Sequence, residues 1–207
     1  MNFIDLSYEI NNNIISYTSE EKVYLSSIYN IEKDGFEVSR VNLTTHSGTH
    51  VDAPSHMIKT GLNIDEVNLE NFIGKALVLH HTLNSPIPLD ILNNLNLNHI
   101  DFLFFYTGAE KLWNNNSFLN NYQVPSKELI DNICTSNLKG IGTDAISIDS
   151  CSSEDFYNHV NLLKSGKLIY ECLNNLSLLK NEYFEFYGLP LKISKGDASP
   201  VRAFAKL

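Results

Sequence analysis

The sequence predicts a mixed α/β or α+β domain, and three observations lead to this fold class. Short runs rich in β-branched and aromatic residues recur along the 207-residue chain, with three or four helical segments between them. Residues 101–106 are almost continuously apolar, which is typical of a strand buried on both faces. No boundary-like segment divides the chain, and a hydrophobic content of 43% is enough for one sizeable core. We therefore expect a single domain over residues 1–207.

The first half of the chain contains five expected strands, at residues 3–10, 23–31, 36–45, 75–80 and 101–106. The second and third of these should form a hairpin, because Lys33, Asp34 and Gly35 separate them with a turn signal. Short helices are expected over residues 68–73 and 89–97.

In the second half, Ser126 is a favourable N-cap for a helix over residues 127–134. Another helix is expected over residues 154–163. The expected strands lie at residues 142–148, 167–173, 183–193 and 200–206, and the last two should close the sheet.

Charge and composition restrict the class of partner. A net charge of −9 speaks against nucleic acid and anionic membranes, because both require a basic surface, so we expect a small-molecule substrate. The N-terminal residues lack a basic region followed by an apolar run, and nowhere do about 18 apolar residues follow one another, so we expect a cytoplasmic protein. Cys134, Cys151 and Cys172 are odd in number and widely spaced, which favours neither a disulfide framework nor a thiolate zinc site.

One stretch, residues 45–56, concentrates three of the seven histidines together with an aspartate. His46, His50, Asp52 and His56 all stand at even positions, so an extended backbone would direct them to one face. On a straight strand His46 and His50 would lie about 13 Å apart, too far to share one ion. We therefore expect the end of a strand to run into a bent loop, with the bend near Gly48. Imidazole and carboxylate donors at this density favour Zn²⁺ or Mn²⁺ over Ca²⁺ or Mg²⁺.

Glu171 stands out among the apolar residues 167–173. A carboxylate in a buried strand is costly unless it is paired or bound to a metal ion, and the alternative is a solvated glutamate on an edge strand. His80 and His81 are neighbours and would point to opposite faces of a strand, so we expect neither of them in a common site, nor His99.

The segment from His46 to His56, H-S-G-T-H-V-D-A-P-S-H, resembles the signature H-x-G-T-H-x-D-x-P-x-H of the cyclase-like metal-dependent hydrolases, the family of bacterial kynurenine formamidase and isatin hydrolase. Similar segments extend over nearly the whole chain, from residues 4–7 through 142–149 and 189–192 to 199–203. The resemblance implies a swivelling β/β/α fold and a homodimer or homotetramer.

The resemblance also implies roles for individual side chains. Five of them would bind two divalent ions, Zn²⁺ first and Mn²⁺ as the second possibility: His46, His50, Asp52, His159 and Glu171. Asp52 and Glu171 would bridge both ions, and His56 would transfer a proton. A family aromatic residue that lines the substrate pocket corresponds to Tyr17, although the loop here lacks the family's Pro and Gly, and an ordinary half-buried loop aromatic is the alternative.

Together these features imply an arylformamidase-like hydrolase that cleaves a formamide, lactam or cyclic amide. N-formylkynurenine, from tryptophan catabolism, is the best-known family substrate. The alternatives are a family member that binds metal or ligand without turnover, and a cyclase or dehydratase acting on a small carbonyl compound. A hydrolase with a cysteine nucleophile is disfavoured, because Cys172 follows Glu171 and would point to the opposite face of the strand.

Overall fold

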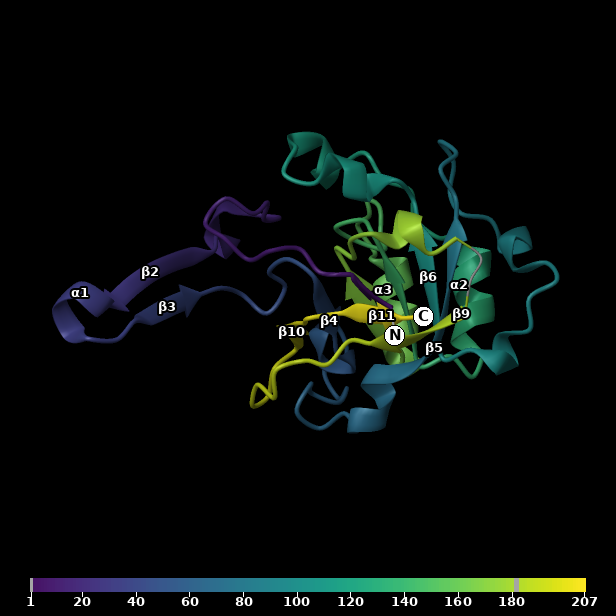
Figure 1. Ribbon diagram of the computed structural model, residues 1–207. Coiled ribbons are helices and arrows are strands. Elements are labelled where there is room, and N and C mark those ends of the chain that lie inside the picture. The colour runs from purple at the N-terminus through teal and green to yellow at the C-terminus, as the bar shows by residue number, and fades with distance from the viewer. Residues whose placement is uncertain (1, 181–182) are drawn as a thin grey trace.

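A nine-stranded sheet forms the centre of the computed structural model, which describes residues 2–180 and 183–207 (Figure 1). Its strands lie side by side in the order β1-β11-β9-β5-β6-β7-β8-β4-β10. Their bounds are β1 Phe3–Asp5, β4 His50–Asp52, β5 Ile73–His80, β6 Phe102–Tyr106, β7 Gly140–Thr143, β8 Leu168–Glu171, β9 Tyr183–Tyr187, β10 Ala198–Pro200 and β11 Phe204–Lys206. Strands β5 to β8 pair in parallel, whereas the pairs toward both edges are antiparallel. The fold is therefore mixed α+β, as the sequence predicts.

Apolar side chains cover both faces of the middle of the sheet, and strand β6 contributes to both of them. Phe102 and Phe104 belong to the hydrophobic cluster on one face, together with Tyr170. Leu103 and Phe105 belong to the cluster on the other face. All five residues of β6 are buried, so the prediction of a strand covered on both sides is confirmed.

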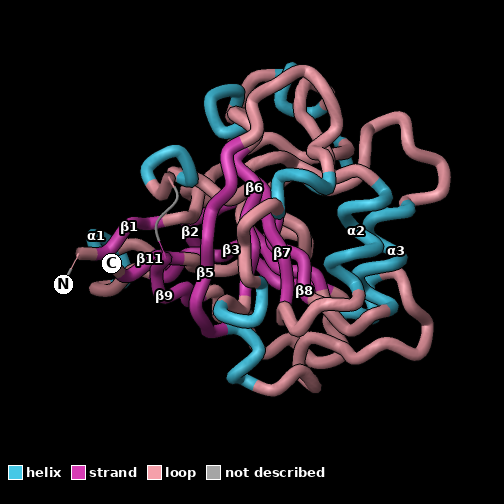
Figure 2. Tube along the Cα trace, turned by 90° about the vertical axis from the view of Figure 1, so that its right-hand side faces the viewer, coloured by secondary structure: helices cyan, strands magenta, loops and turns pink. Residues whose placement is uncertain are grey.

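Two helices, α2 (Lys127–Cys134) and α3 (Tyr157–Lys164), cover one face of the sheet (Figure 2). The Ser126 hydroxyl accepts a hydrogen bond from the Leu129 amide at 3.2 Å, which confirms the predicted N-cap. Among residues 2–180 and 183–207, no helix combines the length and apolar character needed to cross a bilayer.

Several elements are shorter than the sequence predicts, for local reasons. The strand expected over residues 142–148 ends at Thr143, because the Asp144 carboxylate turns away to accept hydrogen bonds from the Thr107 and Gly108 amides at 2.8 and 2.9 Å. The helix expected over residues 89–97 is reduced to the single turn Leu89–Leu92, and Asn94 then adopts the left-handed conformation with φ +69°.

A hairpin, here called the arm, extends away from the body between β1 and β4 (Figure 1). It consists of β2 (Tyr24–Tyr29), the helical turn α1 (Ile31–Asp34) and β3 (Val38–Asn42), with Gly35 at φ +78° after α1, so the predicted hairpin is confirmed. The arm exposes seven large apolar side chains: Tyr24, Ile28, Tyr29, Ile31, Phe36, Val38 and Val41. A two-stranded hairpin has little hydrophobic core of its own, so no other part of the arm covers these apolar side chains.

Candidate metal centre

The histidine stretch starts with a tight turn and then becomes a strand. The Ser47 amide donates a hydrogen bond to the Thr44 carbonyl at 3.2 Å, and Gly48 has φ +64°, a conformation that glycine adopts at little cost. The chain then enters β4, which pairs antiparallel with β8 on one side and β10 on the other. The predicted bend at Gly48 is present and follows the end of β3 at Asn42, as expected, but a further strand, β4, begins directly after it. Because β4 is extended, His50 and Asp52 point to the same face of the sheet.

Glu171 and His159 approach this face from the second half of the chain. The register places Glu171 directly opposite His50, and β8 lies inside the sheet, so the side chain is only 5% exposed and the edge-strand alternative is wrong. His159 is on α3, where its Nδ1 lies 2.7 Å from Asp149 Oδ2. This contact directs its Nε2 toward Glu171 Oε1, 3.2 Å away.

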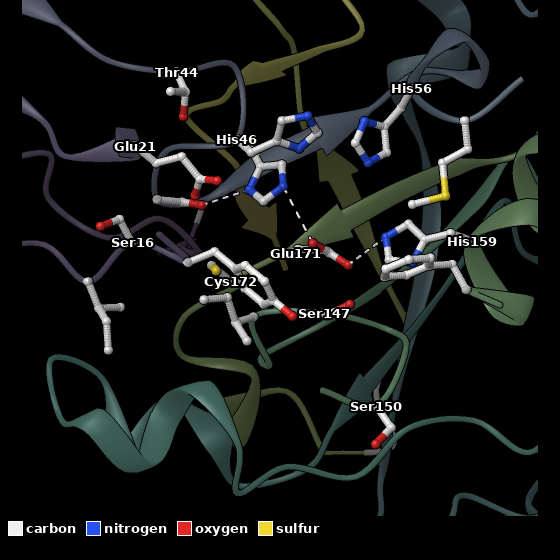
Figure 3. A pocket seen from close by; sticks show the side chains of 17 residues that line it. Ser16, Glu21, Thr44, His46, His56, Ser147, Ser150, His159, Glu171 and Cys172 are labelled. Atoms are coloured by element: carbon white, nitrogen blue, oxygen red, sulfur yellow. Dashed lines mark hydrogen bonds and ion pairs between the residues drawn. The ribbon is translucent and has the colours of Figure 1, made fainter. Parts of the chain in front are cut away.

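Nitrogen–oxygen distances connect the five expected metal ligands into one cluster, part of which Figure 3 shows. Asp52 Oδ1 lies 3.0 Å from His46 Nδ1 and 3.4 Å from His50 Nε2, and Asp52 Oδ2 lies 3.6 Å from His159 Nε2. Glu171 Oε2 lies 3.5 Å from His50 Nε2. Each carboxylate therefore faces more than one imidazole, which is the arrangement that shared ligands of two ions require.

Asp52 gives the clearest sign that a cation belongs in this cluster. It is fully buried, and within the described part of the chain neither of its carboxylate oxygens nor His50 Nε2 has a partner in hydrogen-bonding geometry, although His46 Nδ1 stands 3.0 Å from Oδ1. An ionised carboxylate is costly to bury unless an opposite charge compensates it. Two groups of three side chains each bring their ligand atoms within 4.8 Å of one another, namely His46 with Asp52 and His56, and His50 with Asp52 and Glu171. Asp52 belongs to both groups, so the donor set fits two neighbouring divalent ions.

His56 lies at the border of the cluster, in the single turn Pro54–His56 that follows β4. Its ring centroid is 4.3 Å from that of His46 and 6.0 Å from that of His159. This position suits a proton donor beside the ions, although the side chain could also complete the first of the two groups. Proton transfer by His56 therefore stays a prediction.

Four of the five expected ligands, all except Asp52, line a cavity of about 360 Å³ together with His56. Tyr17 lines it too and is 52% exposed, so the chain places this residue where the resemblance implies, while its role in substrate binding stays a prediction. Phe156 is a second aromatic residue of the cavity that the sequence did not single out. Its backbone is left-handed, with φ +46°, which is strained for a bulky side chain and has no signal in the sequence. His80, His81 and His99, all among the described residues, lie outside the cavity, as expected.

Two carboxylates contact the predicted histidines without having been predicted themselves. Asp149 accepts hydrogen bonds from the backbone amide of His159 at 3.0 Å and from its ring at 2.7 Å. Asp197 Oδ2 lies 3.0 Å from His46 Nε2 and 3.3 Å from His56 Nδ1. Asp197 is separated from His46 by 151 positions in the chain, so the pattern around either residue could not connect them.

The two carboxylates near His46 should make metal binding depend on pH. Burial alone would lower the pKa of His46, but Asp197 and Asp52 outweigh burial and raise it to about 10 in the metal-free protein. Below that pH an ion bound by His46 has to displace a proton, so metal affinity should rise with pH by up to about tenfold per unit for one displaced proton. Competition with a chromophoric chelator at several pH values checks this expectation, after correction for the titration of the chelator. An affinity that stays constant from neutral to mildly alkaline pH would show that no proton is displaced.

Comparisons with known proteins identify the family to which the chain belongs. Residues 4–150 match the family model described as "Putative cyclase". An uncharacterised protein of Methanocaldococcus jannaschii is 37% identical over 86% of this chain and 88% of its own length. A kynurenine formamidase of Geobacillus thermodenitrificans is 29% identical over 97% of this chain and 95% of its own length.

The same fold occurs among solved structures. The crystal structure of an isatin hydrolase bound to the product analogue thioisatinate superposes with a TM-score of 0.87, covers 98% of this chain and 91% of its own, and is 22% identical. At this level of identity the likeness concerns the fold. Because the family model covers more than half of the chain and includes the whole histidine stretch, the chain belongs to the family described as "Putative cyclase".

Proposed function

We propose that this protein is a metal-dependent hydrolase that cleaves the C–N bond of a formamide, lactam or cyclic amide. The observation that carries the proposal is the fully buried Asp52 carboxylate, which has no partner in hydrogen-bonding geometry within the described residues and which two groups of potential ligands share beside an accessible cavity. The kynurenine formamidase among the relatives supports a formamide as the first substrate to test.

Five side chains would hold two divalent ions in this proposal, Zn²⁺ first and Mn²⁺ as the alternative: His46, His50, Asp52, His159 and Glu171. When bound, such ions lower the pKa of water and polarise a carbonyl group. His56 would take up a proton from the attacking water at Nε2 and give it to the nitrogen that leaves when the C–N bond breaks. The Asp149 carboxylate would keep the His159 ring oriented through the 2.7 Å contact with Nδ1.

A cysteine mechanism receives no support from the cavity. Contrary to the expectation that it would point to the opposite face, Cys172 lines the cavity with Glu171, because β8 ends at Glu171 and Cys172 is left-handed with φ +53°. It is buried, however, and burial raises the pKa of its thiol well above the usual value, with the charges of Glu171 and Asp52 adding to the effect. A thiol in this environment stays protonated and is a poor nucleophile. The family description leaves a cyclase or dehydratase as the second candidate, and a binding protein without turnover as the third.

A substrate panel separates these candidates. N-formylkynurenine, a simple aryl formamide, isatin and an aliphatic lactam would be incubated with the chain as purified, after chelation, and after addition of Zn²⁺ or Mn²⁺. The proposal predicts hydrolysis that disappears on chelation and returns with metal. Hydrolysis that resists chelation would favour a nucleophilic residue, and metal binding without turnover of any amide would favour the second or third candidate.

Tyr17→Ala tests the wall of the cavity. If the half-exposed ring contacts the substrate, its loss should raise KM several-fold and lower kcat much less, because the interaction is made in the ground state and the transition state alike. Tyr183→Ala is a matched control, since Tyr183 is 50% exposed on β9 and lies outside both the cavity and the arm. Equal kinetics for the two variants would show that Tyr17 is not in contact with the substrate.

We also propose that the protein assembles as a homodimer or homotetramer and that the exposed apolar side chains of the arm lie in the contact. Ile31 and Phe36 at its tip are 65% and 52% exposed, so their replacement by lysine should not disturb an isolated chain. Sedimentation is expected to give a multiple of the 23.4 kDa chain mass for the wild type and a smaller assembly for Ile31→Lys/Phe36→Lys. A wild type that sediments as a single chain would contradict this proposal.

A further inference from the structure

Asp197 connects two histidines of the centre through a single oxygen atom. It lies just before β10, and its backbone carbonyl accepts a hydrogen bond from the Ala53 amide at 2.9 Å, which holds it next to the histidine stretch. Its Oδ1 accepts a hydrogen bond from the Thr45 hydroxyl at 2.9 Å. Its Oδ2 is 3.0 Å from His46 Nε2 and 3.3 Å from His56 Nδ1. The carboxylate is thus fixed on one side by Thr45 and faces two imidazoles on the other.

The chemistry of these groups restricts where the protons are. An ionised carboxylate only accepts hydrogen bonds, and a neutral imidazole carries one N–H and one lone pair. Once an ion has displaced the second proton of His46, each neutral ring that faces Oδ2 must therefore keep its hydrogen on the nitrogen nearest to it, which is Nε2 in His46 and Nδ1 in His56. The lone pair then stands on the opposite nitrogen of each ring. In His46 that nitrogen is Nδ1, which already faces Asp52 Oδ1 at 3.0 Å.

We propose that Asp197 is a positioning residue that sets the tautomers of both histidines, so that His46 offers Nδ1 to an ion and His56 offers Nε2 to the substrate. The inference rests on the proposed function for the second role, because only a reaction in which a proton is taken up and passed on uses the lone pair of His56 Nε2. The first role concerns metal binding and is independent of the reaction. One carboxylate would in this way couple the geometry of a ligand to that of the proton donor.

The alternative is that Asp197 only contributes an ion pair at the surface, since its side chain is 43% exposed. Exposed ion pairs contribute little to stability. If Asp197 formed only such a pair, its loss would leave the tautomers of both rings unchanged, and asparagine and alanine at this position would have equal effects. The alternatives differ in how asparagine compares with alanine at this position. In Asp197→Asn the amide oxygen should remain with the Thr45 hydroxyl, so the NH₂ group faces both rings and favours the opposite tautomers. In Asp197→Ala the methyl group forms no hydrogen bond with either ring, so nothing disfavours the original tautomers.

The experiment compares wild type, Asp197→Asn and Asp197→Ala in the full-length chain. Affinity for Zn²⁺ is measured by chelator competition, and kcat and KM are measured on the best amide substrate. Loss of a carboxylate behind a metal-binding histidine typically costs 10–100-fold in affinity or activity, so we expect both variants to weaken Zn²⁺ binding and to lower kcat with KM nearly unchanged. The asparagine variant should be the more impaired of the two. The serine-protease triad provides the precedent, since there the same replacement leaves the geometry intact and favours the wrong tautomer.

The position of the protons is read directly from nitrogen–proton correlation spectra of the Zn²⁺-loaded wild type, which should show the His46 hydrogen on Nε2. Hydrogen on His46 Nδ1, wild-type Zn²⁺ affinity in both variants, or an alanine variant more impaired than the asparagine variant would each overturn the inference. A wild type that binds Zn²⁺ but hydrolyses no amide would contradict the proposed function alone, because affinities and spectra still test Asp197. A wild type that binds no divalent ion would overturn both.

Discussion

His50→Ala is expected to abolish metal binding and hydrolysis together. The Nδ1 atom of His50 lies 2.8 Å from the Gly48 carbonyl oxygen, which directs Nε2 toward Asp52 and Glu171 at 3.4 and 3.5 Å. His50 is only 2% exposed, so no neighbouring surface group can replace the lost donor. We expect metal affinity to fall by more than about 100-fold, because even partners behind a ligand typically change it by 10–100-fold. Activity should fall by at least the same factor.

Elemental analysis, steady-state kinetics and circular dichroism of the same preparations measure this effect. His99→Ala is the matched control, because His99 is an exposed histidine outside the cavity and its loss should change neither metal nor activity. If the His50 variant folds and keeps its full metal content, His50 is not a ligand and the two groups of donors have been assigned incorrectly.

His56→Ala is expected to lower kcat by about 10²–10⁴-fold while metal content stays nearly unchanged, because positioned proton transfer contributes on that scale. The free Nε2 of His56, whose Nδ1 lies 3.3 Å from Asp197, is the atom expected to carry the proton. The ions would still be held by donors from β4, α3 and β8. Metal loss and activity loss should therefore separate in this variant and coincide in His50→Ala.

The separation of metal loss from activity loss in His56→Ala is a demanding test, because His56 lies close to the expected ligands. The ligand atoms of His46, Asp52 and His56 lie within 4.8 Å of one another, so His56 is close enough to act as a ligand itself. A His56→Ala protein that loses metal in proportion to its activity would make His56 a ligand. His81→Ala provides the comparison, since His81 is a buried histidine whose Nε2 contacts the Ser85 carbonyl oxygen, away from the cavity.

The sequence predicted well those elements around the site whose determining residues lie close together in the chain. The N-cap at Ser126 and the bounds of α2 depend on residues within three or four positions, and both are confirmed. The buried character of β6 follows from its own composition. Gly48 marked the bend in the histidine stretch, because its positive φ is a property of the residue itself.

What sequence could not show depends on contacts between distant segments. Residues 50–52 form a strand only because β8 and β10 pair with them, so the sequence did not predict that a strand begins again directly after the bend. Asp197 reaches His46 because β10 pairs with β4, and no pattern near residue 197 indicates this contact. The left-handed backbone of Phe156 likewise results from the loop that leads into α3. The resemblance supplied the connection between the two halves of the site, which composition and periodicity alone did not.

In the proposed function the buried carboxylates and histidines hold catalytic metal. This is tested most directly by elemental analysis of the chain purified without a metal-affinity tag, with formamide hydrolysis measured in the same samples during stepwise removal of metal by a chelator. We expect up to two divalent ions per chain, zinc first, and activity that falls with metal content and returns when metal is added. Glu171→Gln, which removes one of the shared carboxylates, should bind clearly less metal than the wild type. Full hydrolytic activity in protein shown to be free of metal would contradict the account.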